Sequence, residues 1–391
     1  MPPASPAPAL PRRLYAAGHF ARTLSWSFTD LALGNYLHAR LGLTPASTGQ
    51  LLFVSLAYSA LLDLLLAMLF VRVRDQRRTA LRLKLIGGAG TAASACLLFH
   101  TFAVDGNGSG FGLLLAVSLL FRTCYALFDV AQNALTSLLP VDATDAERYV
   151  ADRALVVPVS KLCIAAAMFA VVGDAGSVPA GNEQRICLVI GMLVLLAAVP
   201  LARLPVPAPQ RQAPQPGTPL PLPMAALAPV LLAIAAETAL TGLAGRVLPF
   251  LAHGAALTFA MVAGMVLAPW AAARLQQQLG SEMRTILALS LAGVGLVLWR
   301  RTALIARTHA GQAGRHDDLS CFALLTASMK LSIALSSLLL GQLLAGVDAG
   351  QASARGGVLL LTLAGSVLTC AVLALAAPRR SLLPLLPGPL R

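Results

Sequence analysis

The sequence predicts an all-α polytopic membrane protein, and three observations support that fold class. Of its 391 residues, 57% are apolar and 12% are charged, whereas soluble domains carry about 25% charged residues. Apolar runs of about 20 residues, long enough to cross a bilayer as a helix, recur along the chain. Period-two alternation is absent, which argues against a membrane β-barrel. Because lipid cannot hydrogen-bond to the backbone, we expect helical spans.

The apolar runs fall into two groups on either side of a proline- and glutamine-rich segment. We expect a disordered lead over residues 1–19, a six-helix bundle over 20–204, a cytoplasmic linker over 205–222, a second helix bundle over 223–378 and a tail over 379–391. The expected spans are 20–39, 48–71, 84–104, 111–139, 154–173 and 185–202, then 224–244, 247–273, 285–299, 319–346 and 356–377. Proline ends helices, which is why the linker is predicted to be non-helical.

The positive charges indicate how the chain is oriented in the membrane. The net charge is +13, but the arginines lie mostly between apolar runs, which favours membrane topology over nucleic-acid binding. The most basic loop is "RVRDQRRTALRLK", residues 72–84. Because positive loops stay in the cytoplasm, the N-terminus and the linker are predicted to be cytoplasmic, and the protein to lie in the plasma (inner) membrane.

The second half does not satisfy the same charge rule. One crossing after the loop flanked by Arg274 and Arg284 would place the basic segment 300–315 outside. A further span between residues 299 and 317 would restore the rule, so one helix of the second half is predicted to be missing or degenerate. Alternatively, 285–299 is re-entrant, because its residues span only about 22 Å as a helix.

Ionisable residues inside spans are costly and indicate function. Asp63 lies deep in the second span, in "LAYSALLDLLLAML". Asp129 shares one helical face with Tyr125, Gln132 and Asn133. A carboxylate, two amides and a phenol suit a polyhydroxylated ligand. The alternative for both acids is structural: ion pairing for Asp63 and interhelical hydrogen bonding for Asp129.

Lysines are the expected counter-charges of these acids. Lys330 lies mid-span and is predicted to project toward an acid of the first half, either as part of the site or only to lock the halves together. Lys161, nearer the cytoplasmic end, is more readily structural. Weaker candidates to line a cavity are Asp30, which has helical spacing to Thr23 and Ser27, and Glu237.

Six spans, a linker and a second bundle resemble the plan of the major facilitator superfamily. Within it, "FDVAQNALTSLLPVDATDAER" is similar to the fourth span and following loop of the glycoside–pentoside–hexuronide:cation symporters, the melibiose permease family. The matching positions are Asp129, Asn133, Ala134, Leu135, Asp145, Glu147 and Arg148. Two further stretches are similar to the family's second and eleventh spans: "LGLTPASTGQLLFVSLAYSALLD" and "SCFALLTASMKLSIALSSLLLGQLLAG", with Lys330 on the family's lysine.

The resemblance implies roles for individual residues. Asp63 matches the second of two acids that hold the coupling cation in the family, Ser59 replaces the first, and Thr23 replaces an aspartate used for sugar. A single carboxylate can still carry a proton. The resemblance also implies a cytoplasmic loop in which ion pairs gate or lock the protein; the expected members are Asp145, Glu147, Arg148, Arg153 and Lys161.

Three functions remain open at this stage. The first is a secondary symporter of a glycoside or related solute, coupled to a proton or sodium. The second is an uncoupled facilitator of another solute, and the third is a degenerate protein that does not transport. No catalytic or metal-binding pattern appears, so an enzyme, a metal site and an organic cofactor are not expected. The expected partners are a small solute and the lipid bilayer, and the protein is expected to be a monomer.

Overall fold

A computed structural model describes residues 9–71, 73, 75–100, 109–140, 143–168, 171, 181–203, 224–247, 302, 305 and 318–348. All the regular elements in these ranges are helices. The expected linker, the C-terminal tail, the spans at 247–273, 285–299 and 356–377 and the region of the expected missing span lie outside the described residues, apart from Val247, Thr302 and Ile305.

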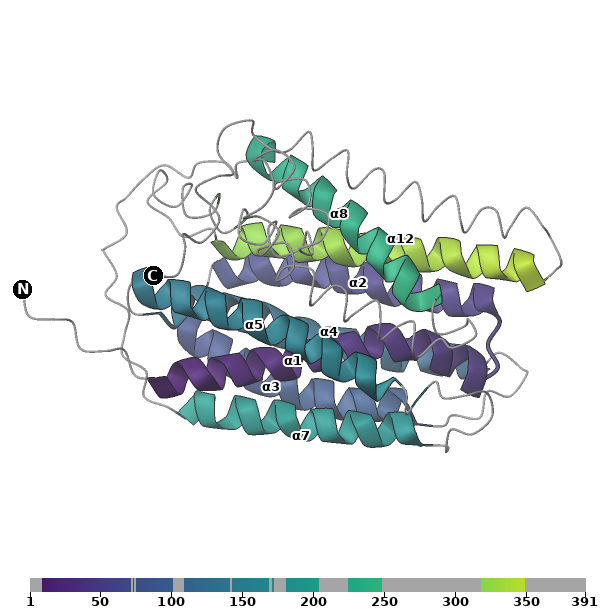
Figure 1. Cartoon of the computed structure of the whole chain (residues 1–391), viewed down its shortest axis with the longest axis horizontal. Coiled ribbons are helices and arrows are strands. Elements are labelled where there is room, and N and C mark those ends of the chain that lie inside the picture. The colour runs from purple at the N-terminus through teal and green to yellow at the C-terminus, as the bar shows by residue number, and fades with distance from the viewer. Residues whose placement is uncertain are drawn as a thin grey trace, which may run out of the picture.

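Each of the six predicted spans of the first half corresponds to a helix. Helix α1 continues directly into a π-helical turn, η1 (Tyr36–Arg40). The helices are α1 (Ala9–Asn35), α2 (Pro45–Val71), α3 (Gln76–Leu98), α4 (Ser109–Leu138), α5 (Ala143–Ala167) and α7 (Asn182–Arg203). They run side by side along the long axis of the molecule (Figure 1).

Three helices begin well before their predicted spans. Helix α1 starts at Ala9, so the expected disorder over 1–19 is wrong from residue 9 onward; Pro11 is tolerated because it lies in the first turn. Helix α3 starts at Gln76. Asp75 is its N-cap, and its side chain accepts a hydrogen bond from the Arg78 backbone N–H at 2.9 Å. Helix α5 starts at Ala143.

These early starts have a common physical cause. A span predicted from hydropathy begins where the charged residues end. Arginine, lysine and glutamate are nevertheless good helix formers, so the helix itself can include them. The basic residues from Arg77 to Lys84, expected in a loop, therefore form the first turns of α3. The segment from Asp145 to Arg148, also expected in a loop, forms the first turns of α5.

The helices of the first half pack through small residues. The most extensive contacts in this half join α3 to α4 and α7, and α1 to α5 and α7. At Gly87 of α3, an added Cβ would lie 2.9 Å from the Cys124 carbonyl oxygen of α4. Such close backbone approach is how helices associate in lipid, where burial of apolar surface gives little advantage.

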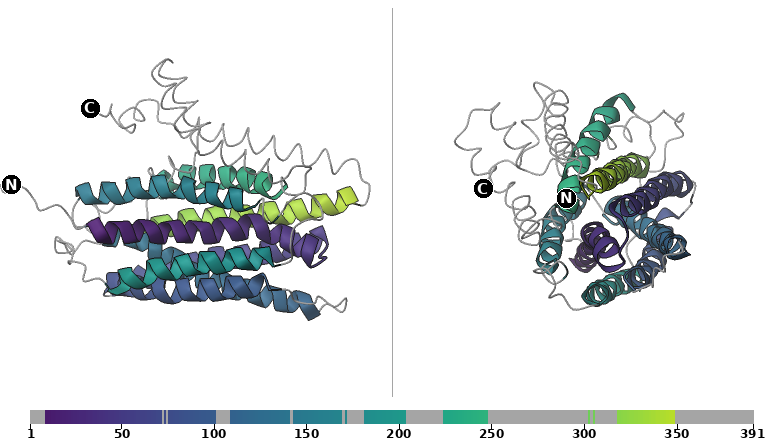
Figure 2. Two further views of the ribbon diagram at one scale, coloured as in Figure 1. Left: turned by 60° about the horizontal axis from the view of Figure 1, so that its bottom comes forward. Right: turned by 90° about the vertical axis from the view of Figure 1, so that its right-hand side faces the viewer.

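The described part of the second half comprises α8 (Met224–Val247) and α12 (Asp318–Asp348). Helix α12 packs along α2 of the first half and against α8 (Figure 2). The two helices approach closely at a crossing of two glycines, since a Cβ on Gly341 would lie 2.6 Å from the Pro45 carbonyl oxygen and 2.9 Å from the Gly49 Cα. The α2–α12 interface therefore joins the two halves directly.

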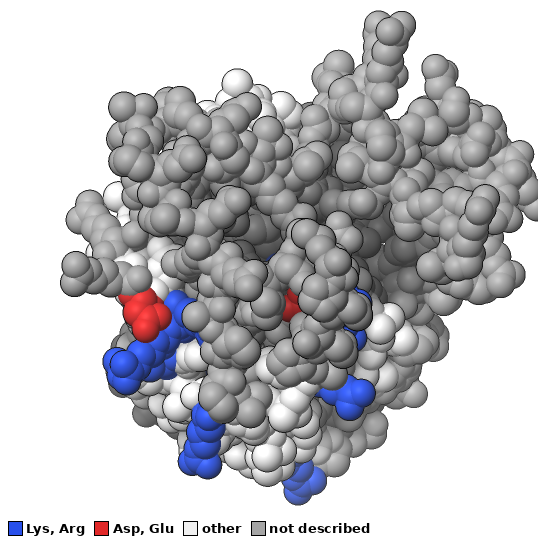
Figure 3. Space-filling model, turned by 90° about the vertical axis from the view of Figure 1, so that its left-hand side faces the viewer, with Lys and Arg blue, Asp and Glu red and all other residues white. Residues whose placement is uncertain are grey.

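The surface of the described helices fits a lipid environment. Five of them are long and apolar enough to cross a membrane. Large apolar side chains point outward in mid-helix, among them Leu61, Leu155 and Leu196, each at least 67% exposed. At the end where α1, α3 and α5 begin, basic side chains gather (Figure 3); the exposed ones are Arg13, Arg78, Arg82, Arg148 and Arg203.

Candidate functional site

A cluster of buried charges lies where α1, α2, α4 and α12 meet. It contains two acids, Asp63 of α2 and Asp129 of α4, and two cations, Arg22 of α1 and Lys330 of α12. None of these side chains is more than 12% exposed. Because unpaired charges are costly at this depth, the equal number of positive and negative groups stabilises the cluster.

Lys330 connects the two halves of the protein. Its Nζ lies 2.7 Å from Asp63 Oδ1 and 2.6 Å from Asp63 Oδ2. The same Nζ is 3.6 Å from Asp129 Oδ2. The structure thus bears out the expectation that this lysine projects toward an acid of the first half, and it shows that two acids share it.

Asp129 has a second cation, Arg22 of α1, which the sequence did not lead us to expect in the site. Arg22 Nη1 donates to Asp129 Oδ1, and lies 3.3 Å from Asn133 Oδ1. Asn133 Nδ2 also donates to Asp129 Oδ1, at 3.1 Å. A charge count could have indicated this arginine, since two buried acids and Lys330 leave one negative charge unbalanced.

Aromatic rings border the charged cluster. Trp26 of α1 and Tyr125 of α4 lie 5.2 Å apart between centroids, and Lys330 Nζ is 5.6 Å from each ring. The buried guanidinium of Arg122 lies 5.1 Å from the Trp26 ring. These cation–π distances place Trp26 between two positive groups. Tyr125 was predicted from its helical face, whereas Trp26 and Arg122 were missed.

Helices α1 and α4 are joined by further polar contacts toward the basic end. The Tyr15 hydroxyl lies 2.6 Å from the Thr136 hydroxyl. Gln132 Nε2 donates to the Tyr15 carbonyl oxygen at 3.2 Å. The predicted stripe of α4 therefore faces α1 along its length, with Gln132 one turn beyond the carboxylate of Asp129.

Two other predicted residues, Thr23 and Ser59, are buried near the cluster. The Thr23 hydroxyl donates to the His19 carbonyl oxygen within its own helix, at 2.8 Å. Ser59 lies one turn before Asp63, and its hydroxyl has no hydrogen-bond partner among the described residues. The Thr23 hydroxyl thus forms its hydrogen bond within its own helix, whereas the Ser59 hydroxyl can still form a hydrogen bond beside Asp63.

The expected role of Lys161 as a counter-charge is not borne out. This lysine is partly buried on α5 and forms no salt bridge within the described part of the chain. Asp63 and Asp129 are held instead by Lys330 and Arg22. The reason is geometric. Helix α1 packs against both α4 and α5, and Arg22 of α1 forms the salt bridge to Asp129.

The other predicted ionic residues differ in burial, and the charge of Arg153 acts on Asp129. Asp145 is buried, Arg148 is exposed and Arg153 is partly buried. The side chains of Glu147 and Glu237 lie outside the described set, and Asp30 is only partly buried.

Two ion pairs not expected from the sequence lie near the helix ends. Near the basic end, Arg12 Nε lies 2.9 Å from Asp152 Oδ2. Toward the opposite end, Arg40 Nε lies 3.3 Å from Glu183 Oε1.

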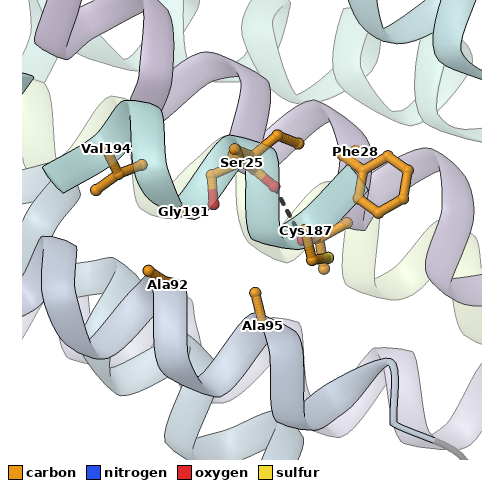
Figure 4. A pocket seen from close by; sticks show the side chains of 9 residues that line it. Ser25, Phe28, Ala92, Ala95, Cys187, Gly191 and Val194 are labelled. Atoms are coloured by element: carbon orange, nitrogen blue, oxygen red, sulfur yellow. Dashed lines mark hydrogen bonds between the residues drawn. The ribbon is translucent and has the colours of Figure 1, made fainter. Parts of the chain in front are cut away.

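A small cavity lies away from the cluster, between α1, α3 and α7 (Figure 4). Its lining is mainly apolar, and the Thr29 hydroxyl at its edge donates to the Ser25 carbonyl oxygen at 2.9 Å. With a volume of about 10 Å³, it has room for about one water molecule. It is a packing defect rather than a solute site.

The cluster is suited to exchanging charge partners. Within the described ranges, no group of three or more His, Cys, Asp or Glu side chains is placed to hold a metal. Protonation of Asp63, or a cation bound to it, would weaken its attraction to Lys330. Such a change would act directly on the contact between the two halves of the protein.

Comparisons with known proteins agree with this architecture. Residues 14–206, which comprise most of the first bundle, match the family model described as MFS/sugar transport protein. No curated protein matches the sequence significantly.

Several solved transporters share the fold over nearly their whole length. A POT family transporter solved with a thioalcohol-conjugated peptide has a TM-score of 0.62 at 12% identity, covering 93% of this chain and 96% of that one. The nucleoside transporter NupG, in a point-mutant form, has a TM-score of 0.58 at 12% identity, covering 93% and 99%. A bacterial homologue of the human lysosomal transporter Spinster has a TM-score of 0.58 at 14% identity, covering 99% and 100%.

At these identities the structural likeness shows the fold alone. Residues 14–206 therefore belong by sequence to this transporter family, and the fold of the whole chain is that of the multi-pass membrane transporters of the major facilitator superfamily.

Proposed function

We propose that this transporter is a secondary active carrier of a sugar, a glycoside or a related polar solute, driven by a proton or sodium gradient. The observation that carries the proposal is Lys330 of the second half, shared between Asp63 and Asp129 of the first. A lysine held by carboxylates across the two halves makes their relative position depend on the charge of those acids. The resemblance to the glycoside–pentoside–hexuronide:cation symporters supports the same function.

Coupling would proceed through Asp63. A proton or a sodium ion on this carboxylate competes with Lys330, because a neutral or cation-bound acid attracts the ammonium less strongly. The Ser59 hydroxyl, one turn away and without a hydrogen-bond partner among the described residues, is an added oxygen ligand for the ion. Release of Lys330 frees α12 from α2, and the two halves then change their relative orientation by alternating access.

The solute would bind on the Asp129 side of the cluster. Asp129, Asn133 and Arg22 offer acceptors and donors on adjoining faces of α4 and α1. Trp26 and Tyr125 add aromatic surface next to them. Polar groups that fix orientation beside apolar rings are typical of small-molecule sites and suit a polyhydroxylated ring.

The orientation follows from the basic end of the molecule. Exposed arginines gather where α1, α3 and α5 begin, which assigns that end to the cytoplasm of a plasma membrane by the positive-inside rule. The Gly49–Gly341 crossing of α2 and α12 then lies toward the outer side. We expect the carrier to act as a monomer, because the paired charges come from the two halves of one chain.

The test is uptake of labelled glycosides into proteoliposomes under imposed sodium or proton gradients. Wild-type protein is expected to accumulate a solute against its gradient, and Asp129→Asn to abolish uptake. Asp63→Asn is expected to abolish the response to the gradient. A matched control is Asp75→Asn at the cap of α3, where asparagine caps as well as aspartate; its uptake should equal that of wild type.

The second candidate is an uncoupled facilitator, favoured by Ser59 in place of a second acid on α2. Equilibrative uptake that ignores both gradients, with Asp63→Asn still active, would establish that function instead. A folded, monodisperse protein that moves no solute of the panel would contradict both candidates and favour a protein that has lost transport.

A further inference from the structure

Lys84 of α3 is a buried cation that the charged cluster does not use. Its side chain is 1% exposed, and its Nζ has no hydrogen bond or salt bridge to any residue that the structure describes. An unpaired ammonium at this depth is strongly unfavourable. A residue that costs stability in this way points to a binding partner that arrives from outside the chain.

The ammonium faces a specific notch on α1. An added Cβ on Gly18 would touch the Lys84 ammonium and would lie 3.1 Å from Gln132 Oε1. The absent side chain of Gly18 therefore lets two polar atoms from α3 and α4 approach the same point. Gln132 is held by its Nε2, which donates to the Tyr15 carbonyl oxygen, while its Oε1 accepts no hydrogen bond within the described residues.

Lys84 Nζ and Gln132 Oε1 differ in the hydrogen bonds that they can form with a ligand. An ammonium only donates hydrogen bonds, and an amide oxygen only accepts them. A ligand that satisfies both must present an acceptor, preferably anionic, beside a donor. A carboxylate with a hydroxyl on the neighbouring carbon has this arrangement, with the carboxylate on Lys84 and the hydroxyl on Gln132.

The surrounding charge also favours an anion. The positive charges of Arg22, Arg153 and Lys84 all act on the ring of His19, the residue after Gly18. The nearby acid, Asp129, is already shared by Arg22 and Lys330. His19 is fully buried, and both its ring nitrogens are without a hydrogen-bond partner among the described residues.

The site adjoins the solute face proposed above. Gln132 is one turn from Asp129 on α4, an axial separation of about 4.5 Å at 1.5 Å per residue. A small solute held at Asp129 can therefore extend to Lys84. Resting on the proposed transport function, we propose that Lys84, Gln132 and the Gly18 notch bind the carboxylate end of a hydroxy acid, so that the solute is a polyhydroxylated carboxylate.

The experiment compares two probes that differ at one end. Gluconate and sorbitol are six-carbon polyols, the first ending in a carboxylate and the second in a hydroxymethyl group. Their binding to the purified full-length protein in nanodiscs is measured by calorimetry. Wild-type protein is expected to bind gluconate about tenfold more tightly or better, the value of one charge-assisted contact.

Two variants test the assignment independently. Lys84→Met removes the charge and should bring the gluconate-to-sorbitol affinity ratio to about one. Gly18→Ala keeps the charge but displaces the flexible ammonium from the notch, and should reduce the ratio similarly without disturbing the helix. Lys161→Met, on a lysine that forms no salt bridge with a described residue, is the matched control and should leave the ratio unchanged.

Distinct results would overturn the inference. If the preference for gluconate survives in both variants, the anion is held elsewhere. If chloride or phosphate alone occupies Lys84 as tightly as gluconate, the site takes an inorganic ion rather than a hydroxy acid. If neutral glycosides are transported while gluconate gains nothing over sorbitol, this inference fails and the proposed function stands; if no solute is transported, the proposed function fails instead.

Discussion

The pairing of Lys330 with Asp63 makes a quantitative prediction about stability. Replacing Lys330 by methionine keeps an unbranched side chain as far as Cε and removes the charged Nζ. Asp63, which is fully buried, then loses both contacts to Nζ, at 2.6 and 2.7 Å. Asp129 is affected less, because it retains Arg22.

The size of the effect follows from the burial of the pair. Removing one partner of a buried ion pair costs about 3–5 kcal/mol, because the other charge is left without compensation. Replacing both partners by neutral groups is close to neutral. We therefore expect Lys330→Met alone to lower the free energy of unfolding by about 3 kcal/mol, and the double variant Lys330→Met with Asp63→Asn to recover most of that loss.

A double-mutant cycle measures this directly. Unfolding of wild type, both single variants and the double variant is followed by circular dichroism in mixed micelles, and the coupling energy is the departure from additivity. Lys161→Met serves as the control, with an expected change within about 0.5 kcal/mol. Additive effects, with a coupling energy below about 0.5 kcal/mol, would refute the pairing of Lys330 with Asp63.

Three further predictions concern other contacts. Arg22→Met should destabilise the protein by less than the roughly 3–5 kcal/mol of a fully unpaired acid, since Asp129 keeps a lysine at 3.6 Å; equal stability of Arg22→Met and wild type in a urea titration would contradict this. Gly341→Ala should force α2 from α12 at Gly49, at an overpacking cost of about 1–3 kcal/mol, visible as a longer distance between spin labels on the two helices; an unchanged distance would argue against the crossing. Lys84→Met should raise the free energy of unfolding by about 1–3 kcal/mol, because it removes a desolvated charge, and a less stable variant in thermal melts would show that Lys84 has a partner.

The shared lysine also explains why two acids are retained in this lipid-embedded fold. Asp63 and Asp129 come from different helices and meet at a cation from the other half of the chain. Asp129 also has Arg22 of the first half, whereas the salt bridge of Asp63 is to Lys330 of the second half. The burial of Asp63 therefore depends on contact between the halves, which links the state of the site to the state of the whole protein.

The class of the fold and the chemistry of its interior follow from the amino-acid sequence. Apolar runs of bilayer length predict helices because lipid leaves the backbone no other partner, and all six predicted spans of the first half are helical. Helical periodicity placed Tyr125, Gln132 and Asn133 on the face of Asp129. It did not locate the starts of α1, α3 and α5, because hydropathy stops at the first charges while the helix continues through them.

Which charges pair with one another depends on how the helices pack. Periodicity relates residues within one helix, whereas a pair such as Arg22 with Asp129 depends on how α1 crosses α4. The same limit hid Trp26 and Arg122, whose distance of 5.1 Å exists only between packed helices. For the same reason Lys161 was expected to be a counter-charge, and Lys84 was expected in a basic loop. In the structure α3 packs against α4, and Lys84 lies at the notch of Gly18.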